Sequence, residues 1–127
     1  MRRTTCLAIV IATTGGLSSL SGDAYAYTVY VSNEKDNSIT AIDSATLEVL
    51  HTYPVGQRPR GIMPTKDGKS LLICASDDDT VQILDLASGQ IVGTLPSGPD
   101  PEQLNMHPSG SPVYIANEDD SLATACR

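Results

Sequence analysis

Val31-Ser-Asn-Glu-Lys-Asp-Asn-Ser-Ile39 is followed 42 residues later by Ile73-Cys-Ala-Ser-Asp-Asp-Asp-Thr-Val81, and 42 residues further on by Ile115-Ala-Asn-Glu-Asp-Asp-Ser-Leu-Ala123. Each copy begins at an apolar run, passes through an acidic turn and enters a second run that is apolar in the first two copies. Other positions keep the same spacing: Thr52, Pro54 and Gly56 recur as Thr94, Pro96 and Gly98. A period near 40 residues built from short β runs is typical of the blades of a β-propeller.

Each complete repeat contains four strand-like segments separated by turn residues. In the middle repeat they cover residues 61–63, 71–73, 81–84 and 91–95, with turn signals at Asp67-Gly68 and Ser88-Gly89. No apolar stripe with helical spacing follows residue 26, so no helix is predicted there. We predict an all-β fold, namely a fragment of a β-propeller with about two and a half four-stranded blades. We name the strands of a blade A to D, from the innermost outward.

The first 26 residues have the pattern of a secretory signal peptide. A basic start, Met1-Arg2-Arg3, precedes the apolar run 7–12 and the A-x-A site Ala24-Tyr25-Ala26. Polar and glycine residues at 13–16 interrupt the run before it reaches the roughly 20 apolar residues of a membrane-spanning helix. We predict cleavage after Ala26, a periplasmic location and no membrane anchor. The partial propeller then comprises residues 27–56 (from strand B), 57–98 and, as an incomplete repeat, 99–127.

The composition after residue 26 restricts the class of partner. This part of the chain has 6 basic and 14 acidic residues. Such an excess of negative charge argues against nucleic acid and anionic membranes and favours a basic protein. Cys74 and Cys126 form no C-x-x-C or C-x-x-C-H motif, which excludes zinc-ribbon, thioredoxin and c-type haem sites, and no cofactor is predicted. Cys74 is expected to be a small buried residue, with a Cys74–Cys126 disulfide as the alternative.

Several short motifs resemble a known family. Tyr30-Val31-Ser32-Asn33, Ile42-Asp43 with Ala45-Thr46, Val55-Gly56 and the Asp67-Gly68 turn resemble the YVTN β-propeller repeat family over essentially all of residues 27–127. The loops 56–61, 74–79, 99–102 and 116–120 resemble those of the periplasmic propeller associated with pyrroloquinoline-quinone-dependent alcohol catabolism. The resemblance implies a non-enzymatic accessory or binding protein, with a quinoprotein dehydrogenase or a cytochrome as partner.

The same resemblance implies a ring of roughly seven blades, so this chain is expected to be unable to close a ring alone. At the end of the chain, Cys126-Arg127 stands where Ile42-Asp43 and Leu84-Asp85 end the earlier strands. A truncated or frameshifted reading frame is one explanation, and a partial copy of a longer sequence is the other. Strand A of the first blade and strand D of the last are missing, and the exposed strand edges are expected to favour self-association.

Charged residues gather in the loops expected at the channel mouth. Arg58 and Arg60 occupy the repeat positions that Asp100 and Glu102 occupy one blade later. We predict ion pairs across the blade boundary, and the functional alternative is a charged ring that binds an anionic or polar ligand or a partner. In the B–C loop, Asp77, Asp78 and Asp79 are weak candidates for binding a metal, the alternative being ordinary turn formation.

No catalytic residue is predicted. His51 and His107 lack a carboxylate and a nucleophile nearby in the repeat pattern, so a Ser/His/Asp triad is unsupported. Two alternatives to a binding protein remain: a propeller enzyme, either a quinoprotein-like oxidoreductase or a lactonase, and a non-functional truncated gene product. The fold alone does not choose among them.

Overall fold

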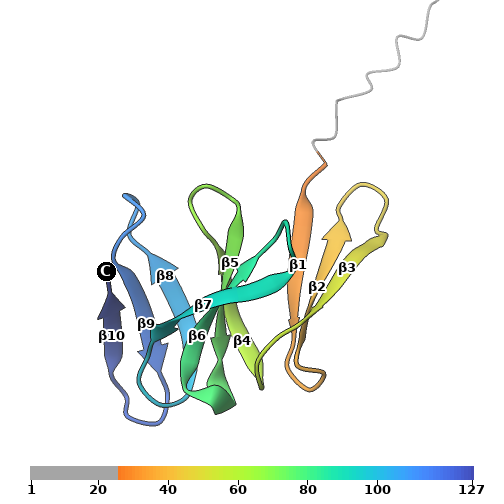
Figure 1. Ribbon diagram of the computed structural model, residues 1–127. Helices are drawn as coiled ribbons and strands as arrows, with labels where there is room; N and C mark the ends of the chain where they lie inside the picture. The colour runs from red at the N-terminus through yellow and green to blue at the C-terminus, as the bar shows by residue number, and fades with distance from the viewer. Residues whose placement is uncertain (1–25) are drawn as a thin grey trace, which may run out of the picture.

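The computed structural model describes residues 26–127, and it confirms the all-β, propeller-like prediction. The predicted signal peptide lies outside the described residues, apart from Ala26. Three antiparallel sheets stand side by side and do not close into a ring (Figure 1). The first sheet consists of β1 (Thr28–Asn33), β2 (Ser38–Asp43) and β3 (Val49–Pro54). The second consists of β4 (Pro59–Pro64), β5 (Ser70–Ala75), β6 (Thr80–Asp85) and β7 (Gln90–Pro96). The third consists of β8 (Pro101–Met106), β9 (Val113–Asn117) and β10 (Ala123–Cys126).

The middle sheet is the centre of the fold because both of its faces are covered. Side chains alternate between the two faces of a strand. Leu71 and Ile73 of β5 therefore pack in the cluster shared with the first sheet, while Leu72 and Cys74 pack in the cluster shared with the third. This explains why residues 71–75 are continuously buried and apolar, where a strand with one wet face would alternate. Full burial stabilises each Leu or Ile by roughly 1.5–3 kcal/mol.

Close contact between the inner strands of neighbouring sheets depends on one glycine. A Cβ atom added to Gly61 of β4 would lie 2.5 Å from the Glu102 carbonyl oxygen and 2.9 Å from the Cα of Gln103, both in β8. A side chain at this position would collide with backbone that cannot rotate away. Gly61 therefore sets the separation of the second and third sheets at their inner edge.

Two local features differ from the sequence prediction. Residues Ser76–Asp78 form a short 3-10 turn, whereas no helix was expected. Cys74 and Cys126 are both free thiols, so the alternative of a disulfide is wrong for this structure. Burial raises the pKa of the Cys74 thiol to about 12, with a smaller contribution from the charge of Glu102, so this thiol is inert at neutral pH.

The last segment pairs in spite of its unusual residues. Ala123 to Cys126 lie opposite Ala116 to Val113 of β9 in an unbroken antiparallel register. The ladder is made by backbone groups, which explains why small side chains in place of branched ones do not prevent it. Among residues 26–127, no helix is long and apolar enough to cross a membrane.

Candidate functional site

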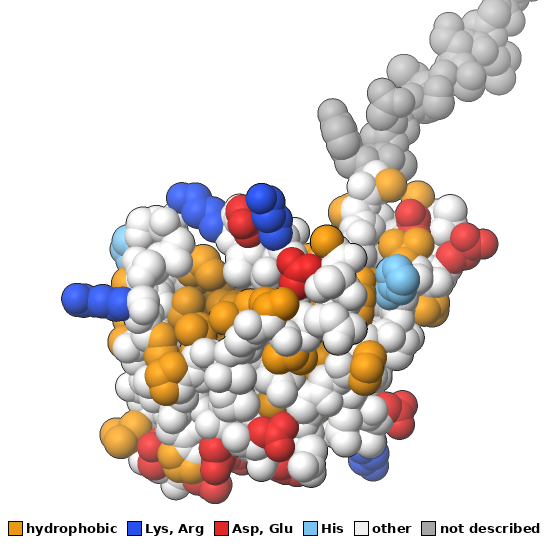
Figure 2. Space-filling model, viewed as in Figure 1, with side chains coloured by type: hydrophobic (Ala, Val, Ile, Leu, Met, Phe, Trp, Pro, Cys, Tyr) orange, Lys and Arg blue, Asp and Glu red, His pale blue; other side chains and the backbone are white. Residues whose placement is uncertain are grey.

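Most of the acidic side chains gather at one end of the three sheets. The B–C loops (34–37, 76–79 and 118–121) and the D–A loops (55–58 and 97–100) lie at this end because the strands alternate in direction. We call these loops, together with Arg60 at the start of β4 and Glu102 at the start of β8, the acidic end. Figure 2 shows acidic side chains along the lower edge of the molecule. It contains ten carboxylates, Glu34, Asp36, Asp77, Asp78, Asp79, Asp100, Glu102, Glu118, Asp119 and Asp120, and three basic residues, Lys35, Arg58 and Arg60. The opposite end has four carboxylates and three basic residues, so the charge of residues 26–127 is strongly polarised.

The loops of the acidic end are tied together by a repeated backbone contact. The Oδ1 atom of Asn37 accepts a hydrogen bond from the Arg58 amide at 2.9 Å, and the Oδ1 atom of Asp79 accepts one from the Asp100 amide, also at 2.9 Å. All four residues have positive φ angles, between 49° and 52°. Asn and Asp tolerate this left-handed conformation better than most residues. The contact fixes each D–A loop against the B–C loop of the preceding blade.

Arg58 connects all three sheets. Its Nε atom lies 3.1 Å from Oε1 of Glu34 in the first blade, and its Nη1 atom lies 3.4 Å from Oδ1 of Asp77 in the second. The same Nη1 atom lies 3.4 Å from Oδ2 of Asp100, at the start of the third blade. The hydrogen bond with Glu34 contributes most to raising the pKa of Arg58 above its usual range, while partial burial opposes it. The predicted closeness of Arg58 and Asp100 is therefore confirmed, with two further carboxylates around the same guanidinium.

Arg60 also lies beside two carboxylates. It forms an ion pair with Glu102, and its Nη1 atom lies 3.7 Å from Oε2 of Glu118. The side chains of Arg60 and Glu102 are 29% and 26% exposed, so this partly buried pair is expected to stabilise the fold by about 1 kcal/mol at most. A hydrogen bond with Glu102, and the charge of that residue, raise the pKa of Glu118.

The sequence identified both arginines and their two repeat partners but missed Glu34 and Glu118. Those two residues occupy the same repeat position, 84 residues apart, and this was the available signal. The middle repeat carries Ser76 there instead, whose buried hydroxyl donates a hydrogen bond to the Pro101 carbonyl at 2.6 Å.

The two arginines thus face five carboxylates. An anionic ligand would have to displace carboxylates from both guanidinium groups, so the geometry argues against the anionic version of the predicted site.

The three aspartates proposed as weak metal candidates have separate roles. Asp77 contacts Arg58, Asp78 accepts a hydrogen bond from the Gln57 amide at 2.8 Å, and Asp79 accepts the Asp100 amide. In the described part of the chain, the carboxylates that meet within 4.8 Å are instead those of Asp100, Glu102 and Glu118. Hard cations favour such oxygen ligands, but here a cation would compete with Arg60 for them.

His107 and Ser109 lie at the opposite end of the molecule, in the β8–β9 turn. The Nδ1 atom of His107 is 2.8 Å from the Ser109 hydroxyl, which itself donates to the Ser111 carbonyl at 2.8 Å. Within residues 26–127 no carboxylate hydrogen-bonds to His107. This is the geometry of a polar turn, and it does not form a catalytic triad.

The comparisons with known proteins agree with the fold. The chain matches the family described as YNCE-like beta-propeller over residues 4–110. It is similar to hydrazine synthase from Kuenenia stuttgartiensis, with 27% identity and a TM-score of 0.69, over 72% of this chain and 26% of that one. It is also similar in fold to a protein of unknown function from Bacteroides caccae (18% identity, TM-score 0.62, 71% of this chain and 34% of that one). A functionally unknown protein from Desulfotomaculum acetoxidans DSM 771 is a further match in fold (14% identity, TM-score 0.61, 79% of this chain and 37% of that one).

The chain thus spans roughly a quarter to just over a third of the structures it matches. Comparison with curated proteins gives no match. The family match covers most of the chain and agrees with the 42-residue repeat and the three antiparallel sheets. This chain belongs to the YNCE-like β-propeller family.

Proposed function

We propose that this chain is a non-enzymatic binding module of the periplasm whose acidic end docks a basic protein. The observation that carries the proposal is the charge of that end, where ten carboxylates outnumber three basic residues. Two of those basic residues, Arg58 and Arg60, are already paired with carboxylates. Complementary charge between two proteins accelerates their encounter and selects against partners of the same sign.

The partner we propose is a cytochrome or a quinoprotein dehydrogenase of pyrroloquinoline-quinone-dependent alcohol oxidation. This part of the proposal rests on the resemblance of the loops 56–61 and 74–79 to that subgroup of propellers. The periplasmic location rests on the basic, apolar and A-x-A order of residues 1–26. Intact-mass measurement of the exported protein tests the location: the chain should begin at Tyr27, and a product that retains Met1 would contradict it.

Binding to a basic c-type cytochrome tests the docking surface. Asp36 and Asp119 are exposed, and within residues 26–127 their side chains make no hydrogen bond or ion pair. The double variant Asp36→Asn, Asp119→Asn should therefore fold normally and weaken binding by about three- to tenfold at low ionic strength. The matched control is Glu48→Gln, which removes an exposed carboxylate from the opposite end.

The salt dependence completes the test. Binding by the wild-type chain should weaken as the ionic strength is raised from about 0.01 M to 0.15 M, because the Debye length shortens from about 30 Å to 8 Å. Two results would overturn the proposal: no binding at low ionic strength, or an equal loss of affinity in the Glu48→Gln control.

A further inference from the structure

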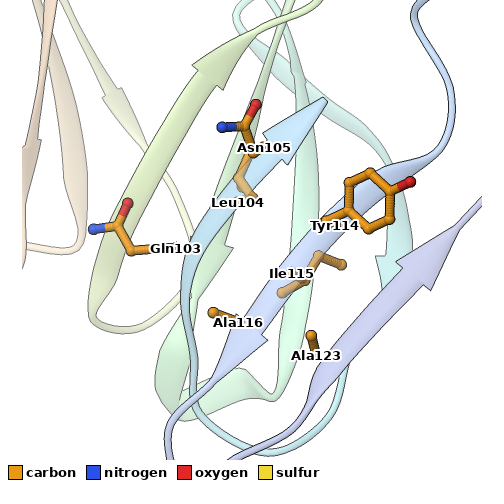
Figure 3. A pocket seen from close by; sticks show the side chains of 7 residues that line it. All are labelled: Gln103, Leu104, Asn105, Tyr114, Ile115, Ala116 and Ala123. Carbon is orange, nitrogen blue, oxygen red and sulfur yellow. The ribbon is translucent and has the colours of Figure 1, made fainter. Parts of the chain in front are cut away.

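Two neighbouring sheets form a cavity at the end of the molecule opposite the acidic end. It lies between the β4–β5 turn and the β8–β9 turn, which stand side by side at the top of Figure 1. Its volume is about 470 Å³, within the roughly 300–1,000 Å³ range of small-molecule sites. A smaller cavity of about 280 Å³ lies against the third sheet, where Gln103, Tyr114 and Ala123 line it (Figure 3). That cavity has no second wall among residues 26–127, so the larger one, whose shape two sheets define, is the better candidate for a site.

Hydrogen bonds within the β4–β5 turn hold the side chains of one wall in place. The Thr65 hydroxyl donates to Oδ1 of Asp67 at 2.7 Å and accepts the Ser70 amide at 3.1 Å. The same Asp67 oxygen accepts the Lys69 amide at 3.1 Å. The bond from Thr65 contributes most to lowering the pKa of Asp67, so this carboxylate is ionised at neutral pH. The wall is therefore positioned before a ligand arrives, which reduces the cost of binding.

Lys66 joins the two turns across the cavity. Its Nζ atom donates a hydrogen bond to the Pro108 carbonyl at 3.1 Å. An ammonium group carries three N–H donors, so two of those of Lys66 remain for a ligand. Pro108 stands at the repeat position of Lys66, which shows that the turn itself does not require a lysine. In the second turn the Ser109 hydroxyl donates to the Ser111 carbonyl at 2.8 Å, and this bond orders the opposite wall.

The polar groups that line the cavity select the chemistry of a ligand. Within residues 26–127, the hydroxyls of Ser70 and Ser111 and the Oδ2 atom of Asp67 make no hydrogen bond. Lys66 and Asp67 carry opposite charges, so an ion attracted by one is repelled by the other. A hydroxyl group both donates and accepts, and it can therefore accept from Lys66 and donate to Asp67. The half-buried Met106 adds an apolar contact for a carbon skeleton.

We propose that this cavity binds a neutral, hydroxyl-rich small molecule of the monosaccharide or polyol class, held by Lys66, Asp67 and Ser70. Adjacent hydroxyls of such a ligand would bridge the ammonium group and the carboxylate. Occupation of this cavity and docking at the acidic end involve separate residues at opposite ends of the sheets, so either can occur without the other.

An NMR titration of the isotopically labelled chain with D-glucose, in a buffer without phosphate, tests the site. Amide shifts should move in residues 65–70 and 106–111 and should saturate with millimolar affinity, as expected for a small ligand in an open cavity. Lys66→Met keeps the length of the side chain and should weaken binding by about fivefold, because it removes a hydrogen bond to the ligand. Lys69→Met is the matched control, since Lys69 is an exposed lysine of the same turn that does not line the cavity. It should bind D-glucose as the wild type does.

Ser70→Ala provides a second variant, because the hydroxyl it removes makes no hydrogen bond within residues 26–127. It should leave the spectrum of the free protein unchanged outside the turn and weaken binding by about threefold. The absence of saturable shifts with D-glucose would overturn the proposal, and so would an equal loss of affinity in Lys69→Met. A stronger response to inorganic phosphate than to D-glucose would show an anion site and would contradict the neutral class of ligand.

Discussion

Asn37 and Asp79 occupy the same position in successive repeats and make the same hydrogen bond to the following D–A loop. Each has a left-handed backbone, and each accepts the amide of a residue that is also left-handed. The two demands together select Asn or Asp: the backbone excludes most side chains, and the bond requires a short side-chain oxygen. The sequence indicated turn residues here, but it did not reveal that they bridge two blades.

Substitution of Asp79 tests this explanation. Asp79→Ala should lower the free energy of unfolding by about 2 kcal/mol, for two reasons. It removes one hydrogen bond, and it leaves at positive φ a residue that lacks the short polar side chain by which Asp tolerates this conformation. Asp79→Asn is the control and should change stability by less than about 0.5 kcal/mol, since Asn37 makes the same bond in the preceding repeat. Urea denaturation measures both. Equal losses in the two variants would show that the negative charge matters more than the acceptor.

At the scale of elements, the arrangement of the sheets depends on how closely the inner strands approach. Gly61→Ala should destabilise the fold by about 1–3 kcal/mol, because the new methyl group meets the backbone of β8. Gly93→Ala in β7 is the control: its Cβ would lie 3.6 Å from the nearest atom, an ordinary contact. Thermal unfolding of the two variants distinguishes them. A Gly61→Ala protein as stable as Gly93→Ala would contradict the close approach of β4 and β8.

The C–D turns provide a pH-dependent contribution to stability. Asp85 Oδ1 accepts hydrogen bonds from the amide and hydroxyl of Ser88, both at 2.7 Å, and Asp43 Oδ1 accepts the amides of Ala45 and Thr46. These bonds lower the pKa of both carboxyls below the usual 3.8. A depressed pKa gives stability that is present above 3.8 and is lost as the pH falls through the folded-state value.

The variant Asp43→Asn, Asp85→Asn should therefore lose less stability than the wild type between neutral and strongly acidic pH. Asn can still accept the same bonds but does not titrate. Urea denaturation at several pH values measures the difference, with Glu48→Gln as the control. If the double variant and the wild type lose the same stability on acidification, these turns do not carry the pH dependence.

The strands could be predicted from the sequence because the repeat imposes the same order of apolar runs and turn residues three times. Residues 71–73 were predicted as a strand, and the structure extends that strand to Ser70–Ala75. The contacts that Glu34 and Glu118 make with the arginines could not be predicted in the same way. Their contacts with Arg58 and Arg60 depend on how far the blades rotate relative to one another, and the spacing within a repeat does not specify that rotation.

At the scale of the whole molecule, the charge is divided between the two ends. The acidic end contains the loops that join strands B to C and D to A, while Lys66 and Lys69 lie in the β4–β5 turn at the other end. The internal pairing of Arg58 and Arg60 leaves the remaining carboxylates of the acidic end without an equal number of basic neighbours. This distribution would orient the proposed basic partner toward one end of the sheets.

The most direct test of docking at the acidic end is an NMR titration of the isotopically labelled chain with a basic c-type cytochrome at low ionic strength. Amide shifts should move in the B–C loops 34–37, 76–79 and 118–121, and these changes should disappear as salt is added. Shifts confined to the turns 44–47, 65–69 and 86–89 at the opposite end, or no shifts at all, would contradict it.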